Sequence, residues 1–278
     1  MIRQYIAYLS NLRITLSVLI NYKTMMFNDL NVRVSPKASI GKNVRIGDNT
    51  VIFDNVVIGD NATIAHNCEI GEPTNEYYSN PDYKNPVTII GANSLIRSHA
   101  IIYAGNKLGE NISTGHRVTL RENNTIGNNT LIGTLSDIQG EVTIGHYCRI
   151  YSNVHISQFS TVGNFVFLYP YVVITNDPYP PSNDLNGGTI SDYTLVGVHS
   201  IIFSGVKVGK NCLVGANSVV TKNFPDHSLI MGDPAKLVMD IRKYVVIGKG
   251  SLYPWMNRFS RGMPWENEGF EVWKQKQH

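Results

Sequence analysis

The chain has 278 residues, of which 42% are hydrophobic, so it is long enough for one sizeable core and too short for two full-size domains to be the default. Its formal charge of +3 is small for this length, and no run of basic residues alternates with aromatic residues. These properties argue against nucleic acid as a partner.

The first 22 residues are apolar enough to raise the question of a membrane anchor. Arg3 and Arg13, however, leave uncharged stretches that are too short to span a bilayer, and no small-residue cleavage site follows. We expect residues 1–35 to form a partly helical N-terminal segment whose apolar side covers the open end of the main domain. A helix that lies on a membrane surface is the alternative, and the cytoplasm is the default location.

From residue 36 the sequence repeats with a period of six, and only Thr114 interrupts its aliphatic positions. Many repeats continue with glycine, any residue and asparagine, and Gly and Asn tolerate the left-handed backbone of a sharp corner. Three repeats make one triangular turn, and stacked turns bury the aliphatic column. The sequence therefore predicts an all-β parallel β-helix over residues 36–225. The aliphatic series are Ile40, Ile46, Ile52, Ile58, Ile64 and Ile70; Ile90, Ile96, Ile102 and Leu108; Leu120, Ile126, Ile132, Ile138, Ile144, Ile150, Ile156, Val162, Leu168 and Ile174; and Ile190, Val196, Ile202, Val208, Val214 and Val220.

The three cysteines, Cys68, Cys148 and Cys212, each lie four residues after an aliphatic position. Small residues at that place should fill the space beside the aliphatic column. We interpret the thiols as core residues, not as nucleophiles or metal ligands, and expect no disulfide.

Two insertions, residues 71–88 and 176–189, interrupt the repeat. If neither hides a further repeat, Ile70 and Ile174 stand about five whole turns apart, and both loops leave the same corner roughly 24 Å from each other. Loops on a rigid scaffold commonly carry function, so the face between them is the first place to look for a site. The C-terminal tail, residues 226–278, loses the period and is rich in aromatic residues, which predicts packing on the last turns or on a neighbouring subunit.

The register stacks outward residues of successive turns between the two insertions. It predicts that Asp137 and His155 are neighbours about 5 Å apart on the exposed face. A second column, formed by Glu122, Gly140, Gln158 and Asn176, makes the adjoining corner polar.

These repeats resemble those of the hexapeptide-repeat acyltransferase superfamily over residues 36–240. Residues 214–238 are similar to the C-terminal signature of its coenzyme A-dependent members. The resemblance implies a left-handed helix, a homotrimer with active sites between subunits, and acetyl-CoA or another acyl-CoA as co-substrate. It also implies a coenzyme A groove near the last turns, with contacts from Ser204, Gly205, Ala216, Lys222, Pro234 and Lys236. The two lysines could pair with phosphates.

Residues 172–182 resemble a loop in the branch that N-acylates nucleotide-linked amino sugars, and residues 152–156 resemble the strand whose asparagine approaches the sugar amine. That asparagine corresponds to Asn153. The resemblance implies a nucleotide-linked amino sugar as acceptor, in lipopolysaccharide or other surface-polysaccharide biosynthesis. The chain departs from that branch in its N-terminal segment, its longer tail and His155.

Acyl transfer from a thioester to an amine needs a group that removes a proton and donors for the tetrahedral oxyanion. Histidine suits the proton step, and a neighbouring carboxylate fixes its tautomer. We therefore predict His155 as base with Asp137; His116, which could reach the site from another subunit, and the absence of any protein base are alternatives. The remaining candidates are Glu122 for catalysis and Asn153, Gln158, Asn176, Asp177 and Arg121 for substrate binding.

Three other functions compete with sugar N-acylation. An O-acetyltransferase acting on a sugar hydroxyl would need the histidine and carboxylate more strictly, because a hydroxyl is a weaker nucleophile. A metal hydratase on the same scaffold requires three converging histidines, and His99, His116 and His155 lack the expected spacing, so we expect no metal. A non-catalytic binding module would not need the signature at residues 232–236.

Overall fold

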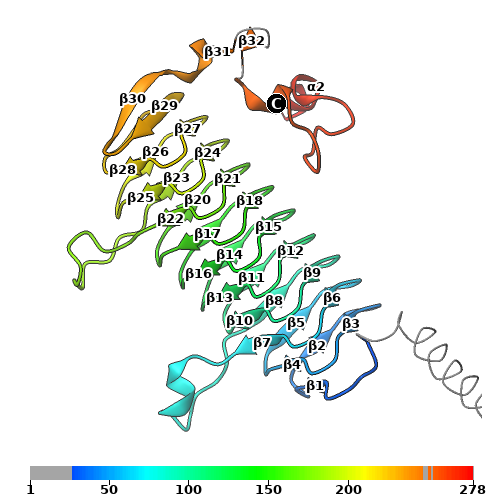
Figure 1. Cartoon of the computed structure of the whole chain (residues 1–278). Coiled ribbons are helices and arrows are strands. Elements are labelled where there is room, and N and C mark those ends of the chain that lie inside the picture. The colour runs from blue at the N-terminus through cyan, green and yellow to red at the C-terminus, as the bar shows by residue number, and fades with distance from the viewer. Residues whose placement is uncertain (1–26, 247–249, 252, 278) are drawn as a thin grey trace, which may run out of the picture.

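The computed structural model describes residues 27–246, 250–251 and 253–277, and its main body is a parallel β-helix (Figure 1). Three parallel sheets form the sides of a prism, and the chain visits them in turn, so each strand pairs with the third strand along. The predicted fold is confirmed. Of the N-terminal segment expected at residues 1–35, residues 1–26 lie outside the described residues, and Arg33–Val34 already form the first strand of the β-helix. No helix in the described ranges is long and apolar enough to cross a membrane.

Sheets A, B and C are named here in the order in which the chain first enters them. Sheet A contains β1 (Arg33–Val34), β4 (Val51–Ile52), β7 (Glu69–Glu72), β10 (Ile101–Tyr103), β13 (Thr119–Leu120), β16 (Asp137–Ile138), β19 (His155–Ile156), β22 (Val173–Ile174), β25 (Ile201–Ile202) and β28 (Val219–Val220). Sheet B contains β2 (Ser39–Ile40), β5 (Val56–Ile58), β8 (Thr88–Ile90), β11 (Lys107–Leu108), β14 (Thr125–Ile126), β17 (Thr143–Ile144), β20 (Thr161–Val162), β23 (Thr189–Ile190) and β26 (Lys207–Val208). Sheet C contains β3 (Arg45–Ile46), β6 (Thr63–Ile64), β9 (Leu95–Ile96), β12 (Ser113–Thr114), β15 (Leu131–Ile132), β18 (Arg149–Ile150), β21 (Phe167–Leu168), β24 (Leu195–Val196), β27 (Leu213–Val214), β29 (Ser228–Gly232) and β30 (Ala235–Asp240).

The aliphatic column forms the core, and from Ile52 to Val220 its members are at most 2% exposed. Asparagine makes many of the corners in the left-handed region, as at Asn43 and Asn61, with φ of 57° and 58°. Glycine allows successive turns to approach: a Cβ on Gly91 would lie 2.3 Å from the carbonyl oxygen of Gly109.

The cysteines are free and buried beside the column, as expected. Burial raises the pKa of the Cys68 and Cys212 thiols to about 11 and that of Cys148 to about 12. The same repeat position holds two fully buried asparagines, Asn106 and Asn124, which the small-residue expectation missed.

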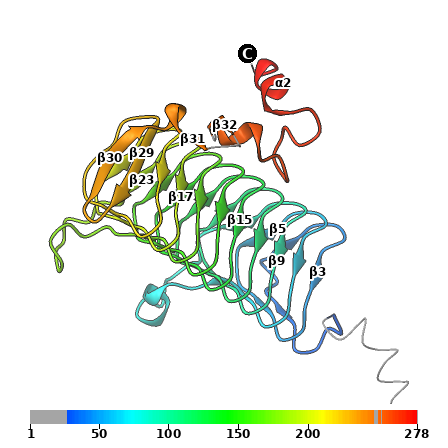
Figure 2. The same cartoon turned by 45° about the horizontal axis from the view of Figure 1, so that its top comes forward.

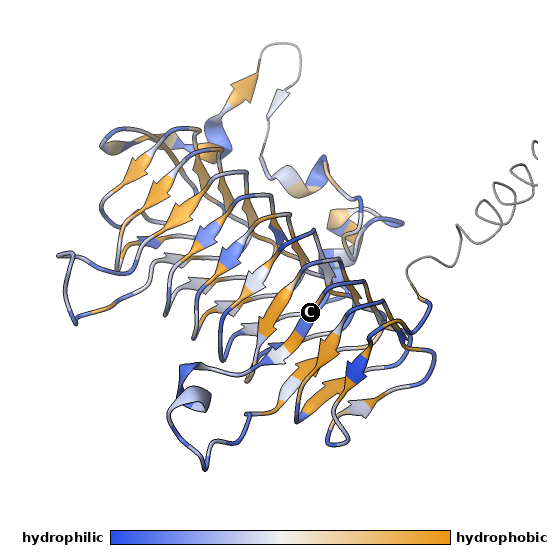
Figure 3. Cartoon of the chain, turned by 60° about the horizontal axis from the view of Figure 1, so that its bottom comes forward, coloured by the Kyte–Doolittle hydropathy of each residue, from blue (hydrophilic) through white to orange (hydrophobic). Residues whose placement is uncertain are grey.

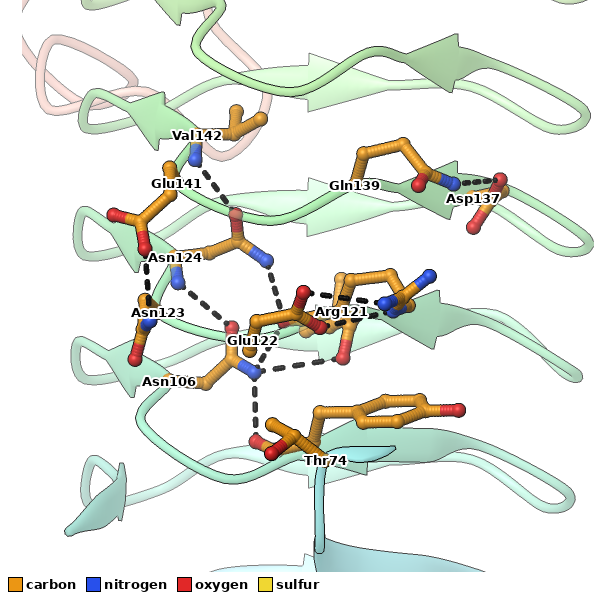
Figure 4. Close-up of polar contacts among 12 residues, drawn as sticks. Thr74, Asn106, Arg121, Glu122, Asn123, Asn124, Asp137, Gln139, Glu141 and Val142 are labelled. Carbon is orange, nitrogen blue, oxygen red and sulfur yellow. Dashed lines mark hydrogen bonds and ion pairs between the residues drawn. The ribbon is translucent and has the colours of Figure 1, made fainter. Parts of the chain in front are cut away.

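The two buried asparagines form an amide ladder at the corner between sheets A and B (Figure 4). The Nδ2 of Asn106 donates to the carbonyl oxygen of Arg121 at 2.6 Å, and its Oδ1 accepts from the backbone N–H of Asn124 at 3.3 Å. The Oδ1 of Asn124 in turn accepts from the N–H of Val142 at 2.8 Å. The ladder satisfies polar groups that would otherwise be buried without partners. It thereby fixes the backbone of the corner that carries Arg121.

Both insertions leave this same corner, as the register predicts. The first connects β7 to β8 and contains η2 (Asn75–Tyr78), and the second connects β22 to β23. Four strands of sheet A, β10, β13, β16 and β19, lie between β7 and β22. The two loops project from one edge of the prism and are mainly hydrophilic (Figures 1 and 3).

The tail packs on the outer face of sheet C. Strand β29 adds parallel to β27, and β30 turns back antiparallel to β29. Beyond η3 (Ile241–Lys243) and the β31 (Val245–Val246) and β32 (Gly250–Ser251) ribbon, η4 (Trp255–Asn257) and α2 (Phe270–Gln275) follow. The buried tail residues Ile241, Tyr253, Trp255, Met256, Met263, Trp265 and Phe270 form one cluster with Phe165, Phe167 and Leu229. Sheet C faces away from the A/B corner, so the tail and the insertions lie on opposite sides of the prism (Figures 1 and 2).

Candidate active site

Two columns of side chains project from sheet A between the insertions. Residues immediately before and after each buried aliphatic residue point outward, because side chains alternate along a strand. One column runs Thr119, Asp137, His155 and Val173 in the observed pairing. The other runs Tyr103, Arg121, Gln139, Ser157 and Thr175, one position after each buried aliphatic residue. The middle of this face is therefore polar.

Asp137 and His155 are bonded, as the register predicted they would be neighbours. Nδ1 of His155 lies 3.0 Å from Oδ2 of Asp137, and the two side chains are 38% and 40% exposed. The same Oδ2 accepts a hydrogen bond from Nε2 of Gln139 at 2.8 Å (Figure 4). The hydrogen bond from His155 lowers the pKa of the Asp137 carboxyl group, against the opposing effect of burial.

The ionised carboxylate of Asp137 can only accept hydrogen bonds, so Nδ1 of His155 carries the proton. In the neutral ring, Nε2 then holds the free lone pair that a general base requires. The structure adds a residue that sequence reasoning missed, because Oγ of Ser157 lies 3.2 Å from this Nε2. The alternation of the strand could have indicated this contact, because Ser157 is the next outward-pointing residue after His155 on the same face of sheet A.

Arg121 and Glu122 form a bidentate ion pair beside this cluster (Figure 4). Nε and Nη2 of Arg121 donate to the two carboxylate oxygens of Glu122 at 2.9 and 3.1 Å. The guanidinium also lies 5.2 Å from the centre of the Tyr103 ring, and its charge contributes to lowering the pKa of Asp137. Glu122 therefore contacts Arg121 and not the histidine. Glu122 thus holds the guanidinium of Arg121 in place.

His116 lies at the other edge of sheet A, at the corner that follows sheet C. It is exposed, and its Nδ1 lies 2.7 Å from Oγ of Ser98. No hydrogen bond or ion pair within the described ranges joins it to Asp137 or His155. Within one chain, the structure keeps His116 apart from the cluster.

The predicted substrate-binding residues take different positions. Asn153 occupies a left-handed corner with φ of 58°, and its N–H donates to the carbonyl oxygen of Thr134 at 2.9 Å. Gln158 follows Ser157 at the insertion corner. Asn176 accepts from the N–H of Asn186 at 2.7 Å, which closes the neck of the second insertion.

Asp177 shapes the second insertion. It accepts from Oγ and N–H of Ser182 at 2.7 and 2.8 Å and from the N–H of Tyr179 at 3.0 Å, and the bond from the Ser182 hydroxyl leads in lowering the pKa of Asp177. The insertion thus has internal order of its own. It rests closely on the corner below, since a Cβ on Gly187 would lie 2.3 Å from the carbonyl carbon of Phe159.

Two further carboxylates, Glu69 and Glu72, stand where the first insertion begins. Burial raises the pKa of both, and the charge of Glu69 raises that of Glu72 further. A groove of about 650 Å³ lies beside them, between the first insertion and the first turns. Among the residues that line it are Arg33, Phe53, Asp54, Tyr77, Tyr83 and Asn85.

The repeats match two protein-family models. The bacterial transferase hexapeptide model (six repeats) matches residues 125–158, and the hexapeptide repeat of succinyl-transferase matches residues 37–71 and 189–222. Over these residues the chain shares the repeats of the hexapeptide-repeat acyltransferase superfamily. A bifunctional protein GlmU from Thermotoga maritima is 25% identical over 181 residues, which are 54% of this chain and 40% of that protein. A galactoside O-acetyltransferase from Escherichia coli is 32% identical over 89 residues, 29% of this chain and 44% of that protein.

The chain therefore spans less than half the length of these two curated relatives. Among solved structures, a UDP-N-acetylglucosamine acyltransferase from Arabidopsis superposes with a TM-score of 0.59 at 18% identity. The match covers 74% of this chain and 72% of that one. At that identity the similarity establishes a shared fold.

The coenzyme A contacts expected from the resemblance to this superfamily fall into two groups. Ser204 and Gly205 lie at the insertion corner, where both bind the carbonyl oxygen of Asn186, at 2.7 and 2.9 Å, and Lys222 occupies the same corner after β28. Ala216 lies at the opposite edge of sheet A. The β29–β30 hairpin with Pro234 and Lys236 is tied to that edge by a bond from the N–H of Gly232 to Oγ of Ser218. A single chain does not bring the six residues together.

The described residues contain no group of three or more histidine, cysteine or acidic side chains arranged to hold a metal ion. His99 contacts His66 edge to face, with ring centres 5.7 Å apart, whereas His116 binds Ser98 and His155 binds Asp137. The three histidines that the hydratase hypothesis required therefore have separate partners within one chain.

Proposed function

We propose that the protein transfers an acetyl or other acyl group from coenzyme A to a sugar, with the amino group of a nucleotide-linked sugar as the first candidate acceptor. The observation that carries this proposal is the His155–Asp137 pair, which stands on an exposed face between two insertions. The matches to the hexapeptide-repeat models support the acyl-CoA donor. The likeness of residues 152–156 and 172–182 to the amino-sugar branch supports the acceptor. Such an activity belongs to surface-polysaccharide synthesis.

His155 accepts a proton from the attacking nucleophile through Nε2 and later returns it to the departing thiolate of coenzyme A. Asp137 holds the ring in the correct tautomer and stabilises the imidazolium that forms. Arg121 supplies a fixed positive charge near the carboxylate, and Glu122 limits where that charge points. Asn153, Gln158, Asn176 and Asp177 remain candidates for binding the acceptor around this centre.

We propose a homotrimer in which each site lies between two subunits. The chain's own tail covers the last turns of sheet C, so sheets A and B remain for contact with partners. The two groups of candidate coenzyme A contacts lie at opposite edges of sheet A, and packing one subunit's edge against the next would bring both groups to one groove. The same packing would offer His116 to a neighbouring site.

An O-acyltransferase is the second candidate. The observed carboxylate and histidine pair meets the stricter requirement of a hydroxyl acceptor for a base. The relationship to galactoside O-acetyltransferases over part of the chain also supports this candidate.

The test is release of free thiol from acetyl-CoA by the full-length protein, with a panel of nucleotide-linked amino sugars and of the same sugars bearing a hydroxyl in place of the amine. Products are then treated with alkaline hydroxylamine, which cleaves esters and leaves amides intact. Stable products support N-acylation, and labile products support O-acylation. If the protein releases no thiol above background with any acceptor, the scaffold is left as a binding module.

A variant that lacks residues 177–188 tests the location. Its β-helix should fold, because the deleted loop lies outside the stacked strands, while acceptor-dependent turnover should be lost. Unchanged turnover in this variant would place the site elsewhere.

A further inference from the structure

The first insertion projects beside the first turns of the β-helix (Figure 1), and a groove of about 650 Å³ lies between the two. Val51 and Phe53, on either side of the buried Ile52 in β4, point outward and form part of its floor. A concave site of this size, with an apolar floor and a few polar groups, has the usual form of a small-molecule site. Asp137 and His155 lie on the same sheet but do not line the groove. The face between the insertions therefore offers a second place for a ligand.

Two tyrosines of the first insertion also line this groove. The ring centres of Tyr77 and Tyr83 are 5.9 Å apart, and the rings stand nearly perpendicular, with an angle of 80° between their planes. Tyr77 is 55% exposed, so much of its ring is open to a ligand. Exposed rings next to the floor at Phe53 provide a stacking surface for a flat group such as a nucleobase.

Three cationic side chains line the groove as well. Lys37 is already paired, with its Nζ 2.7 Å from Oδ2 of Asp54. Arg33 and Lys84 are exposed, and neither makes an ion pair with another residue in the ranges that the structure describes. An arginine and a lysine without a carboxylate partner suit the phosphate groups of a ligand. The groove thus combines a surface for a flat ring with positive charge for an anion.

Hydrogen bonds at the neck of the insertion hold this wall in place. Nδ2 of Asn55 donates to the carbonyl oxygen of Asn85 at 2.7 Å, and Nδ2 of Asn85 donates to that of Gly71, also at 2.7 Å. The hydroxyl oxygen of Tyr83 accepts from the N–H of Thr74 at 3.3 Å. Oδ1 of Asn85 is buried and has no hydrogen-bond partner among the residues described, so a donor at this end of the groove would satisfy it.

We propose that this groove binds the nucleoside diphosphate of the acceptor, an inference that rests on the proposed function. The base lies against Tyr77, and the phosphates lie between Arg33 and Lys84. The sugar then extends along sheet A. Strands β4, β7, β10, β13 and β16 are successive neighbours, so Val51 and Asp137 are about 19 Å apart at ordinary strand spacing.

The strand next to the groove favours this direction of binding. Glu69 and Glu72 belong to β7, between the groove and Asp137. Carboxylates there repel phosphate and accept hydrogen bonds from sugar hydroxyls, so the anionic part of the ligand stays in the groove. Coenzyme A also contains a nucleoside diphosphate, but its candidate contacts, from Ser204 to Lys236, lie on the last turns at the far end of the prism. The acceptor is therefore the source that fits.

Binding is tested without any acyl donor. The full-length protein is titrated by calorimetry with UDP, dTDP and GDP, and separately with coenzyme A. At least one of the three diphosphates should bind, more weakly as the salt concentration rises. Tyr77→Ala and Arg33→Ala should each raise its Kd by about 10-fold or more. Tyr77→Phe keeps the ring and should bind as the wild type does.

Two matched variants remove similar groups outside the groove. Tyr78 is also part of η2 and is 74% exposed, but it does not line the groove. Lys42 is an exposed cation at another corner of the first turns. Tyr78→Ala and Lys42→Ala should both leave the Kd unchanged.

Turnover gives a second measurement. With a nucleotide-linked sugar, Tyr77→Ala should raise KM and leave kcat nearly unchanged, because the ring holds a part of the substrate that does not react. With the same amino sugar lacking the nucleotide, the variant and the wild type should be equal. An equal loss with both substrates would overturn the assignment of the groove to the nucleotide.

The binding results separate this inference from the proposed function. Wild-type protein that binds none of the diphosphates overturns the inference, and so does binding that Tyr77→Ala and Arg33→Ala leave intact. If only coenzyme A binds, and the same two variants weaken it, the groove serves the donor and the assignment to the acceptor is wrong. If a diphosphate binds in the groove but no acceptor gives thiol release, the nucleotide site stands and the proposed acyl transfer fails.

Discussion

Replacing Asp137 by asparagine tests how the carboxylate acts on His155. Both His155 and Gln139 donate to the same oxygen, Oδ2 of Asp137. In Asp137→Asn, an amide nitrogen at that place would face the NH₂ group of Gln139, so Gln139 selects the orientation that keeps an oxygen there. The tautomer of His155 is therefore preserved, and only the negative charge is lost.

The expected loss follows from that geometry. A hydrogen bond to a charged group is worth about 1.5 to 3 kcal/mol, which corresponds to roughly a 10- to 100-fold fall in turnover. His155→Ala removes the base and should lower turnover by about 10²- to 10⁴-fold with little effect on binding. The double variant should be no worse than His155→Ala, because the two groups act as one unit. Adding Gln139→Ala to Asp137→Asn frees the amide to rotate and should deepen the loss.

The assay is steady-state thiol release with a fixed acceptor. The control is His199→Asn, because His199 occupies a left-handed corner with φ of 58°, a conformation that asparagine also adopts. Losses that multiply in the double variant would show that Asp137 and His155 do not work together. Retained turnover in His155→Ala, with loss in His116→Ala, would make the corner histidine the base.

Three further outcomes follow from burial and charge. The pKa of Asp137 is lowered in the folded protein from a value of 3.8, so its pairing stabilises the fold at pH above about 4 and this contribution fades as the pH falls below that value. The difference in free energy of unfolding between wild type and Asp137→Asn should therefore become smaller as the pH falls across that range. A difference that grows in acid would contradict the lowered pKa of Asp137. Cys68, Cys148 and Cys212 should resist a thiol-specific reagent at pH 8 and react fully in denaturant, and rapid reaction of the native protein would contradict their burial. Trp265 is fully buried in the tail cluster, so Trp265→Ala should lower the free energy of unfolding by about 3 to 5 kcal/mol. Limited proteolysis of this variant should cut the tail before the β-helix. A tail as resistant as that of the wild type would show that the cluster does not hold the tail in place.

The period of six predicted the strands, the stacking of Asp137 on His155 and the common corner of the insertions, because a repeating backbone fixes which residues are neighbours. The one aliphatic position held by a polar residue, Thr114, still fits the repeat. Its Oγ1 accepts a hydrogen bond from the N–H of Arg97 at 2.9 Å, whereas in other turns a backbone carbonyl oxygen is the acceptor. The period does not fix how side chains rotate. The bond between Ser157 and His155 and the pairing of Glu122 with Arg121 therefore could not be predicted from the sequence.

The segments outside the repeat were harder to predict from the sequence. The sequence predicted that an aromatic tail packs on the last turns or on a neighbour, and the described residues place it on sheet C of the same chain. Its path depends on long-range contacts such as that of Trp255, whose Nε1 donates to the carbonyl oxygen of Tyr193 at 2.9 Å. No local pattern encodes a contact of that range.

The reversal of β30 also governs what can be added to the end of the prism. The last strand of a parallel stack exposes unpaired backbone N–H and C=O groups. These are the groups with which each turn pairs with the next one, so the end of the stack is a template for further strands. The hairpin changes the direction of the outermost strand on sheet C from parallel to antiparallel. A second copy of the β-helix therefore cannot continue the stack in register along that side. The protein ends its own repeat with a strand that works against end-to-end fibre growth.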